Sequence, residues 1–89
     1  MIDLILNISP EEANAIISGK SENFDVIDHE KVDTIEIWDV WVVVIKHKIT
    51  GMFFMTIYRI GFTEDPKTPY TPNSLPRFFR IDPSYLQTT

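Results

Sequence analysis

This chain has no cysteine, only three glycines and two histidines, and no long apolar run. The lack of cysteine excludes disulfides, thiolate nucleophiles and cysteine-based metal sites, and it fits a reducing compartment. Three glycines cannot build a glycine-rich loop around a phosphate. The longest apolar run, Val40 to Ile45, is far too short to cross a bilayer. The first residues include Asp3 and no basic stretch, so we expect no signal peptide and a cytoplasmic location.

What the chain does contain is sufficient for one small domain. It has 89 residues, of which 44% are hydrophobic, with six Phe, three Tyr and two Trp. This composition supports an apolar core and argues against global disorder. The length lies near the lower limit for folding without disulfides or a metal. We therefore expect residues 1–89 to form a single domain.

Acidic residues are concentrated in the first part of the sequence. Residues 1–39 hold ten acidic residues against two Lys, a net charge of −8, and residues 40–89 hold six basic residues against three acidic ones, a net charge of +3. The total of −5 disfavours binding to nucleic acid or to an anionic membrane, because nucleic-acid affinity depends on neutralising phosphates. An acidic surface suits a basic protein partner, although solubility alone also explains it.

The N-terminal region predicts a strand followed by a short helix. Ser9 suits an N-cap, Pro10 suits the first helical position, and Glu12 suits the second position of a capping box. Gly19 predicts the end of the helix about two and a half turns later, so the helix needs a sheet to pack on. The alternation typical of a strand precedes it, at Ile2, Leu4, Leu6 and Ile8.

Residues 20–34 are polar and acidic, and they predict a short strand near Phe24–Asp28 followed by a loop. Their spacing matches no calcium loop, because the glycine and the terminal bidentate glutamate are missing. We therefore expect neither a metal nor another cofactor here. The side chains in this region that resemble a cluster of metal ligands are Asp25, Asp28, His29, Glu30 and Asp33.

A long β-hairpin is predicted between about residues 35 and 62, with its turn at Thr50-Gly51. A two-residue turn makes Ile49 face Met52, so that opposed residue numbers sum to 101. Both faces are apolar in the middle, and the single short helix covers only one of them. The other face must meet the C-terminal segment, a second subunit or a target protein. The first face collects Trp41, Val43, Ile45 and His47 with Phe54, Thr56, Tyr58 and Ile60, and the second collects Trp38, Val40, Val42 and Val44 with Phe53, Met55, Ile57 and Arg59.

The last part of the chain predicts a loop and a final strand. Four prolines within residues 63–76 favour an extended, stiff loop. A C-terminal strand follows at about residues 77–82, and we expect it on a sheet edge that Arg77 and Arg80 protect. The predicted fold class is α+β: a mainly antiparallel sheet of four or five strands with one short capped helix packed on one face.

The sequence contains few residues in patterns that suggest catalysis, and we expect that this protein is not an enzyme. No Gly-x-Ser-x-Gly elbow surrounds any serine. Glu64 and Asp65 are adjacent in sequence, and neighbours on a strand point in opposite directions, so they are poor partners for acid–base catalysis. Aromatic residues beside basic ones at residues 46–48 and 77–80 are able to stack on bases, but their alternation with core positions favours a core role.

Several short motifs lie in and after the hairpin: Lys46-His47, Thr50-Gly51 before Phe53, Gly61-Phe62-Thr63-Glu64 and Pro69-Tyr70. Together they resemble a family of small uncharacterised bacteriophage proteins with a KH-x-TG-aromatic hairpin and a Gly-x-Thr-Glu segment. The stretch from Ile5 to Lys20 is similar, more weakly, to the opening of ASCH-type, PUA-like RNA-binding domains.

The phage resemblance implies an accessory protein that acts in the cytoplasm of a bacterial host. Our first hypothesis is non-enzymatic binding and inhibition of a host protein, for host takeover or against host defence. The alternatives are an oligomeric sponge for a nucleotide signal and a self-associating structural domain without a ligand. The protein-binding hypothesis assigns contacts to Trp38, Asp39, Trp41, Glu64, Asp65 and Tyr70, and the sponge hypothesis to Trp38, Trp41, Arg59 and Arg77.

Overall fold

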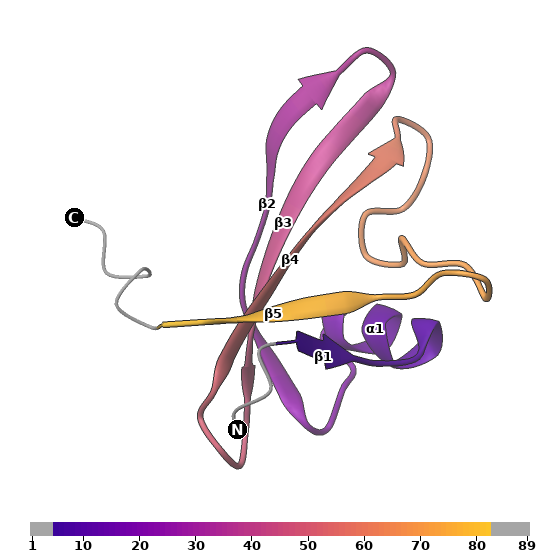
Figure 1. Ribbon diagram of the computed structural model, residues 1–89. Coiled ribbons are helices and arrows are strands. Elements are labelled where there is room, and N and C mark those ends of the chain that lie inside the picture. Colours follow the sequence, from indigo (N-terminus) through magenta and orange to yellow (C-terminus); the bar gives the residue numbers. More distant parts are fainter. Residues whose placement is uncertain (1–4, 83–89) are drawn as a thin grey trace.

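The computed structural model describes residues 5–82, which form one antiparallel sheet with a helix against one of its faces (Figure 1). The strand order is β1-β5-β4-β3-β2. The predicted antiparallel sheet with a single short helix is thus confirmed for these residues, and strands dominate it. In chain order the elements are β1 (Ile5–Asn7), α1 (Pro10–Ile17), β2 (Phe24–Ile35), β3 (Trp38–His47), β4 (Phe53–Gly61) and β5 (Arg77–Ile81).

The helix α1 begins and ends where the sequence predicts. The side chain of Ser9 accepts a hydrogen bond from the backbone N–H of Glu12 at 3.1 Å, and Pro10 occupies the first turn. Gly19 follows the helix with φ of +79°, a left-handed conformation that favours glycine. The capping box is not closed in the predicted way, because the Glu12 carboxylate accepts a hydrogen bond from the hydroxyl of Ser21 at 3.0 Å.

Strand β2 is much longer than predicted, and the loop expected after Asp28 is wrong. The strand runs to Ile35 and pairs with β3 along its whole length. Two register shifts interrupt it, one between Val26 and Asp28 and one between Lys31 and Asp33. Each bulge adds a residue and reverses the alternation of side chains, so a search for strict period-two alternation misses the second half of the strand.

The hairpin of β3 and β4 has the predicted faces but a different register. Paired residue numbers sum to 99, as in Ile45 opposite Phe54, rather than to the predicted 101. The chain turns through residues 48–51, where the N–H of Gly51 donates to the carbonyl of His47 at 2.9 Å and the N–H of His47 donates to the carbonyl of Met52 at 2.8 Å. Because the error is two residues, every side chain keeps its predicted face.

Strand β5 is an inner strand, so the prediction of a C-terminal edge strand is wrong. It lies between β4 and β1, with Phe79 paired to Met55 on one side and to Ile5 on the other. The short strand β1 supplies the missing neighbour, and the edges of the sheet are β1 and β2. Residues 2–4 of the predicted first strand lie outside the described residues.

The apolar core lies between α1 and the sheet. Phe78, Ile16, Ile45 and Val43 are fully buried there, and Tyr70 from the loop between β4 and β5 packs against the same cluster. The side-chain amide of Asn14 fixes this loop to the helix, since it donates to the carbonyl of Tyr70 at 2.8 Å and accepts from its N–H at 3.0 Å. The loop therefore runs on the same side of the sheet as α1 (Figure 1).

Candidate functional site

The sheet face opposite α1 carries several exposed apolar side chains, and we call it the open face. The core cluster lies entirely on the α1 side. On the open face Ile57 is 60% exposed and Phe79 is 48% exposed, whereas Val44 of β3 is buried. Strand pairing assigns to this face Trp38, Val40, Val42 and Val44 of β3, Phe53, Met55, Ile57 and Arg59 of β4, Arg77, Phe79 and Ile81 of β5, and Ile5 of β1.

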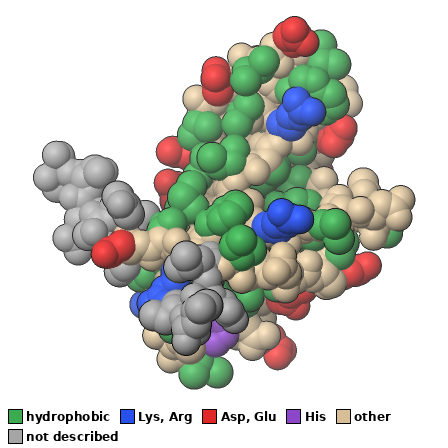
Figure 2. All heavy atoms as spheres, viewed as in Figure 1, with side chains coloured by type: hydrophobic (Ala, Val, Ile, Leu, Met, Phe, Trp, Pro, Cys, Tyr) green, Lys and Arg blue, Asp and Glu red, His purple; other side chains and the backbone are tan. Residues whose placement is uncertain are grey.

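Hydrophobic side chains also dominate the view of the molecular surface over β2, β3 and β4, and acidic side chains lie around their rim (Figure 2). A contiguous apolar surface with a charged rim is the usual composition of a protein-binding site. A sheet face that is exposed to water normally carries polar side chains instead. The open face is therefore a candidate binding surface.

Four carboxylates border the open face along the edge strand β2. Asp28, Glu30 and Asp33 pair with Val44, Val42 and Val40, and Asp25 pairs with Lys46, so all four share the face of those β3 residues. Strict alternation would put residues 25 and 33 on one face and residues 28 and 30 on the other. The two bulges in β2 bring the four together, and this acidic row is a feature that the sequence analysis missed.

Basic residues also lie on the open face. The guanidinium of Arg59 stands 5.3 Å from the ring centroid of Trp38, and the ammonium of Lys46 stands 5.7 Å from that of Phe53. Arg77 is exposed on β5. Among residues 5–82, neither Glu30 nor Arg77 takes part in an ion pair, since the pairs found are Lys31–Asp39 and Lys48–Asp25. The open face is thus acidic along β2, and its basic side chains are spread over β3 (Lys46, opposite Asp25), β4 (Arg59) and β5 (Arg77).

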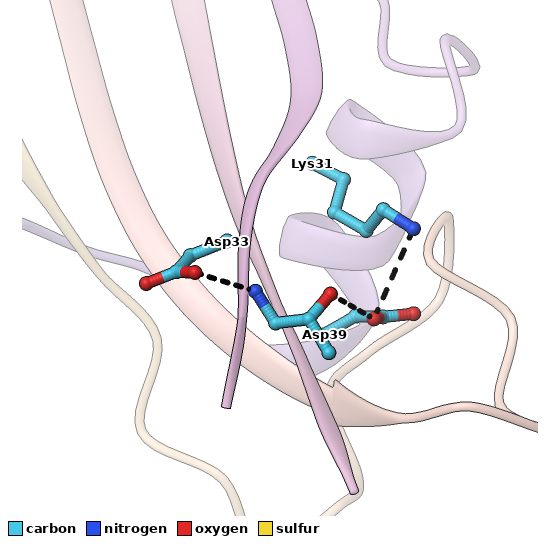
Figure 3. Close-up of polar contacts among 4 residues, drawn as sticks. Lys31, Asp33 and Asp39 are labelled. Atoms are coloured by element: carbon cyan, nitrogen blue, oxygen red, sulfur yellow. Dashed lines mark hydrogen bonds and ion pairs between the residues drawn. The ribbon is translucent and has the colours of Figure 1, made fainter. Parts of the chain in front are cut away.

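Asp39, one of the predicted contact residues, is engaged within the protein. Its carboxylate accepts a hydrogen bond from the hydroxyl of Thr34 at 3.1 Å and lies 4.0 Å from the ammonium of Lys31 (Figure 3). The neighbouring Asp33 accepts a hydrogen bond from the backbone N–H of Thr34 at 2.8 Å. Pairing of residue 39 with Ile60 puts Asp39 on the α1 side of β3, so it does not belong to the open face.

The predicted site residues do not form one site. Trp38 is on the open face, whereas Trp41 and Tyr70 pack against the core on the α1 side. Glu64 and Asp65 are exposed in the loop after β4, where Asp65 accepts a hydrogen bond from the backbone N–H of Lys67. Of the residues predicted to bind a nucleotide, Trp38, Arg59 and Arg77 share the open face and Trp41 does not.

A second polar cluster lies on the α1 side, above Trp41. The hydroxyl of Tyr58 donates to the carbonyl of Pro66 at 2.7 Å and is hydrogen-bonded to Nε2 of His29. Burial raises the pKa of Tyr58, so its phenol stays neutral near pH 7. Burial, reinforced by the charge of Lys67, lowers the pKa of His29. This cluster joins β2, β4 and the loop after β4.

Two further features of residues 5–82 bear on the kind of site. No group of three or more His, Asp or Glu side chains is arranged to hold a metal ion among them. The helix they form is too short to span a membrane.

Comparison with protein-family models, with curated proteins and with solved structures gave no match for this chain. The resemblances to the phage family and to the ASCH-type domains thus stay predictions from short motifs.

Proposed function

We propose that this protein is a non-enzymatic binding protein that attaches through its open face to a host protein in the bacterial cytoplasm and inhibits it. The observation that supports this proposal is the apolar open face bordered by four carboxylates on β2. A matching partner has protruding apolar side chains at its centre and Lys or Arg residues where it meets β2. The role in phage takeover or anti-defence rests on the resemblance of the hairpin motifs.

The free energies expected for apolar burial and for exposed ion pairs favour the apolar part of the open face as the main source of binding affinity. Complete burial of a side chain such as Ile57 or Phe79 contributes about 1.5–3 kcal/mol each. Exposed ion pairs contribute about 0–1 kcal/mol each, so the acidic row mainly selects and orients the partner. The apolar centre is therefore the part to disrupt in a test.

The test is affinity purification of the tagged chain from bacterial lysate, with the retained proteins quantified by mass spectrometry. We expect wild type to retain a host protein in stoichiometric amount and Ile57→Lys to lose it. Thr68→Lys, which adds the same charge at an exposed loop position, is the matched control. A third variant, Glu64→Lys with Asp65→Lys, reports whether the loop contributes. Equal retention by Ile57→Lys would refute the open face as the site, and no retained protein with wild type would refute the proposal.

A nucleotide sponge is the second candidate, because Trp38, Arg59 and Arg77 share the open face. An aromatic ring beside guanidinium groups suits a base and a phosphate. This function requires that nucleotides raise the melting temperature of wild type, since a ligand of the folded state stabilises it. Arg77→Ala must then reduce the shift, and an absence of any shift in a panel of mononucleotides and cyclic dinucleotides would reject the sponge.

A further inference from the structure

We infer that the side of β4 away from β3, between Ile57 and Gly61, binds an extended segment of the target protein, which adds to the sheet as a further strand. We call this stretch the β4 edge. The inference rests on the proposed function, because it names how the target is held beside the open face. When a strand adds to an exposed sheet edge, backbone hydrogen bonds supply affinity and alternate side chains supply specificity.

Strand β5 covers only the first part of β4. The pairing of β4 with β5 ends at Met55 opposite Phe79, although β4 continues to Gly61. Figure 1 shows the reason, since β5 crosses β4 steeply and the two strands diverge beyond the crossing. On its other side, β4 stays paired with β3 as far as Gly61. Within residues 5–82, β4 is therefore an inner strand in its first half and an edge strand in its second half.

The alternation of hydrogen bonds identifies the backbone groups that point out of the β4 edge. The N–H of His47 donates to the carbonyl of Met52 at 2.8 Å, at the start of the pairing between β3 and β4. Hydrogen-bonded pairs alternate along an antiparallel ladder, so Tyr58 exchanges hydrogen bonds with β3 and its neighbours Ile57 and Arg59 do not. The backbone groups of Ile57 and Arg59 therefore point away from β3.

These outward groups are left for another strand. Among residues 5–82, the backbone N–H and C=O of Ile57 and Arg59 have no hydrogen-bond partner. The carbonyl of Gly61 accepts from the N–H of Glu64 at 3.1 Å, and the chain turns away there. The β4 edge thus offers two complete residues and the N–H of a third, a short site for an extended backbone.

Two contacts hold the loop after β4 on the α1 side of the sheet. The hydroxyl of Tyr58 donates to the carbonyl of Pro66, and the side chain of Asn14 binds both backbone groups of Tyr70. Tyr58 belongs to the core on the α1 side, and Asn14 belongs to α1 itself. The exposed side chains of the β4 edge lie on the opposite, open face. An added strand therefore approaches from the open face, where the target is proposed to bind.

The outer edges of the sheet are less suited to an added strand. Sheet edges are protected against further pairing by bulges, charged side chains, proline or short length. Strand β2 has two bulges and a row of carboxylates, and β1 has only three residues. Strand β4 has neither a bulge nor a proline, since its pairing with β3 sums to 99 throughout. Its charged residue, Arg59, lies with its guanidinium 5.3 Å from the ring centroid of Trp38.

The side chains of the β4 edge indicate the chemistry of the added segment. An antiparallel strand is favoured, because antiparallel pairs are slightly more stable and both neighbours of β4 are antiparallel. The ion pairs found among residues 5–82 do not include Arg59, so an acidic residue opposite it would be stabilised. An apolar residue two positions later would face Ile57, which is 60% exposed. The segment thus has the pattern acidic-x-apolar.

The experiment measures amide hydrogen exchange by NMR, with the peptide acetyl-Thr-Thr-Glu-Thr-Ile-Thr-amide as probe. In the free protein, the amides of Ile57 and Arg59 should exchange at least about tenfold faster than that of Tyr58, which is bonded to β3. The peptide at about 1 mM should slow the exchange of Ile57 and Arg59 by at least about twofold.

Two matched controls test the mode of binding. N-methylation of the peptide isoleucine, whose N–H would face β4, should abolish the protection. N-methylation of the threonine before it, whose N–H would face away, should leave the protection in place. Arg59→Glu should reverse the preference, so that a peptide with Lys in place of Glu protects better than the original peptide.

The outcomes separate this inference from the proposed function. Slow exchange of Ile57 and Arg59 in the free protein, no response to the peptide, or equal effects of the two methylated peptides would each overturn the inference. Protection that rises with protein concentration alone would assign the β4 edge to a second copy and also overturn it. Host-protein capture that depends on Ile57 would survive any of those results. Conversely, protection by the peptide in the expected pattern with no captured host protein would support strand addition and refute the inhibitor.

Discussion

His29 and Tyr58 meet across β3, through a hydrogen bond between Nε2 of the imidazole and the phenol hydroxyl. The imidazole lies over Trp41, with ring centroids 4.8 Å apart, and the same hydroxyl donates to the carbonyl of Pro66 at 2.7 Å. One side chain of β4 thus connects the edge strand, the central strand and the loop. These contacts all lie on the α1 side of the sheet, opposite the open face.

Tyr58→Phe should destabilise the fold by about 1–3 kcal/mol, because the half-buried carbonyl of Pro66 and Nε2 of His29 lose their shared partner. Chemical denaturation followed by tryptophan fluorescence measures the change. Thr63→Val removes an exposed hydroxyl near the same loop and serves as control. Equal unfolding free energies for Tyr58→Phe and wild type would mean that the hydroxyl contributes nothing to the attachment of the loop.

The pH dependence of stability should carry a contribution from His29. Its pKa is lowered in the folded state, chiefly by burial and further by Lys67, from the ordinary value of 6.5. As the pH falls below that value, the unfolded chain binds the proton first, so this contribution is fully present above it and decreases toward acid. Unfolding free energies between about pH 7.5 and about pH 5.5 should therefore fall less steeply in His29→Gln than in wild type.

The other imidazole supplies the control for that experiment. His47→Gln leaves His29 in place, so the difference in slope between wild type and His29→Gln should persist when both also carry His47→Gln. If His29→Gln follows the wild-type curve at every pH, the proton equilibrium of His29 is not coupled to folding.

Asn14→Ala should loosen the loop between β4 and β5, because the amide of Asn14 satisfies both backbone groups of Tyr70. We expect a loss of about 1–3 kcal/mol in unfolding free energy and faster trypsin cleavage after Lys67, which lies in this loop. Asn73→Ala, an exposed change in the same loop, is the control. Cleavage at the wild-type rate would show that Asn14 does not restrain the loop.

Local signals in the sequence predict the elements of this fold better than their arrangement. Ser9, Pro10 and Gly19 fix the helix because capping depends on neighbouring residues alone. The faces of β3 and β4 follow from alternation, which survives a register error of two residues. The position of β5 depends on pairing with β1, more than sixty residues earlier, and no local pattern reports such a contact.

The acidic row could not be predicted for a different reason. Asp25, Asp28, Glu30 and Asp33 are visible in the sequence, but their common face depends on two bulges. A bulge has no strong residue signature when no glycine accompanies it. Alternation alone divides these four side chains between the faces, so the charge pattern of the open face emerges only with the strand pairing.

Gly51 provides a direct test of the turn that sets the β3–β4 register. Its φ is +74°, and a Cβ built on it would have no heavy atom within 4 Å, so substitution there acts through the backbone alone. Gly51→Ala should cost about 1–2 kcal/mol of unfolding free energy, the usual penalty for a left-handed conformation at a residue with a side chain. Gly61→Ala is the matched comparison: its Cβ would approach the flexible Glu64 side chain at 3.3 Å, and its φ is not in the left-handed region, so a smaller loss is expected. Chemical denaturation of both variants measures the difference. If Gly51→Ala is as stable as Gly61→Ala, the four-residue turn does not depend on the left-handed conformation of residue 51. The turn would then not be what fixes the register that pairs Val42 with Ile57 on the open face.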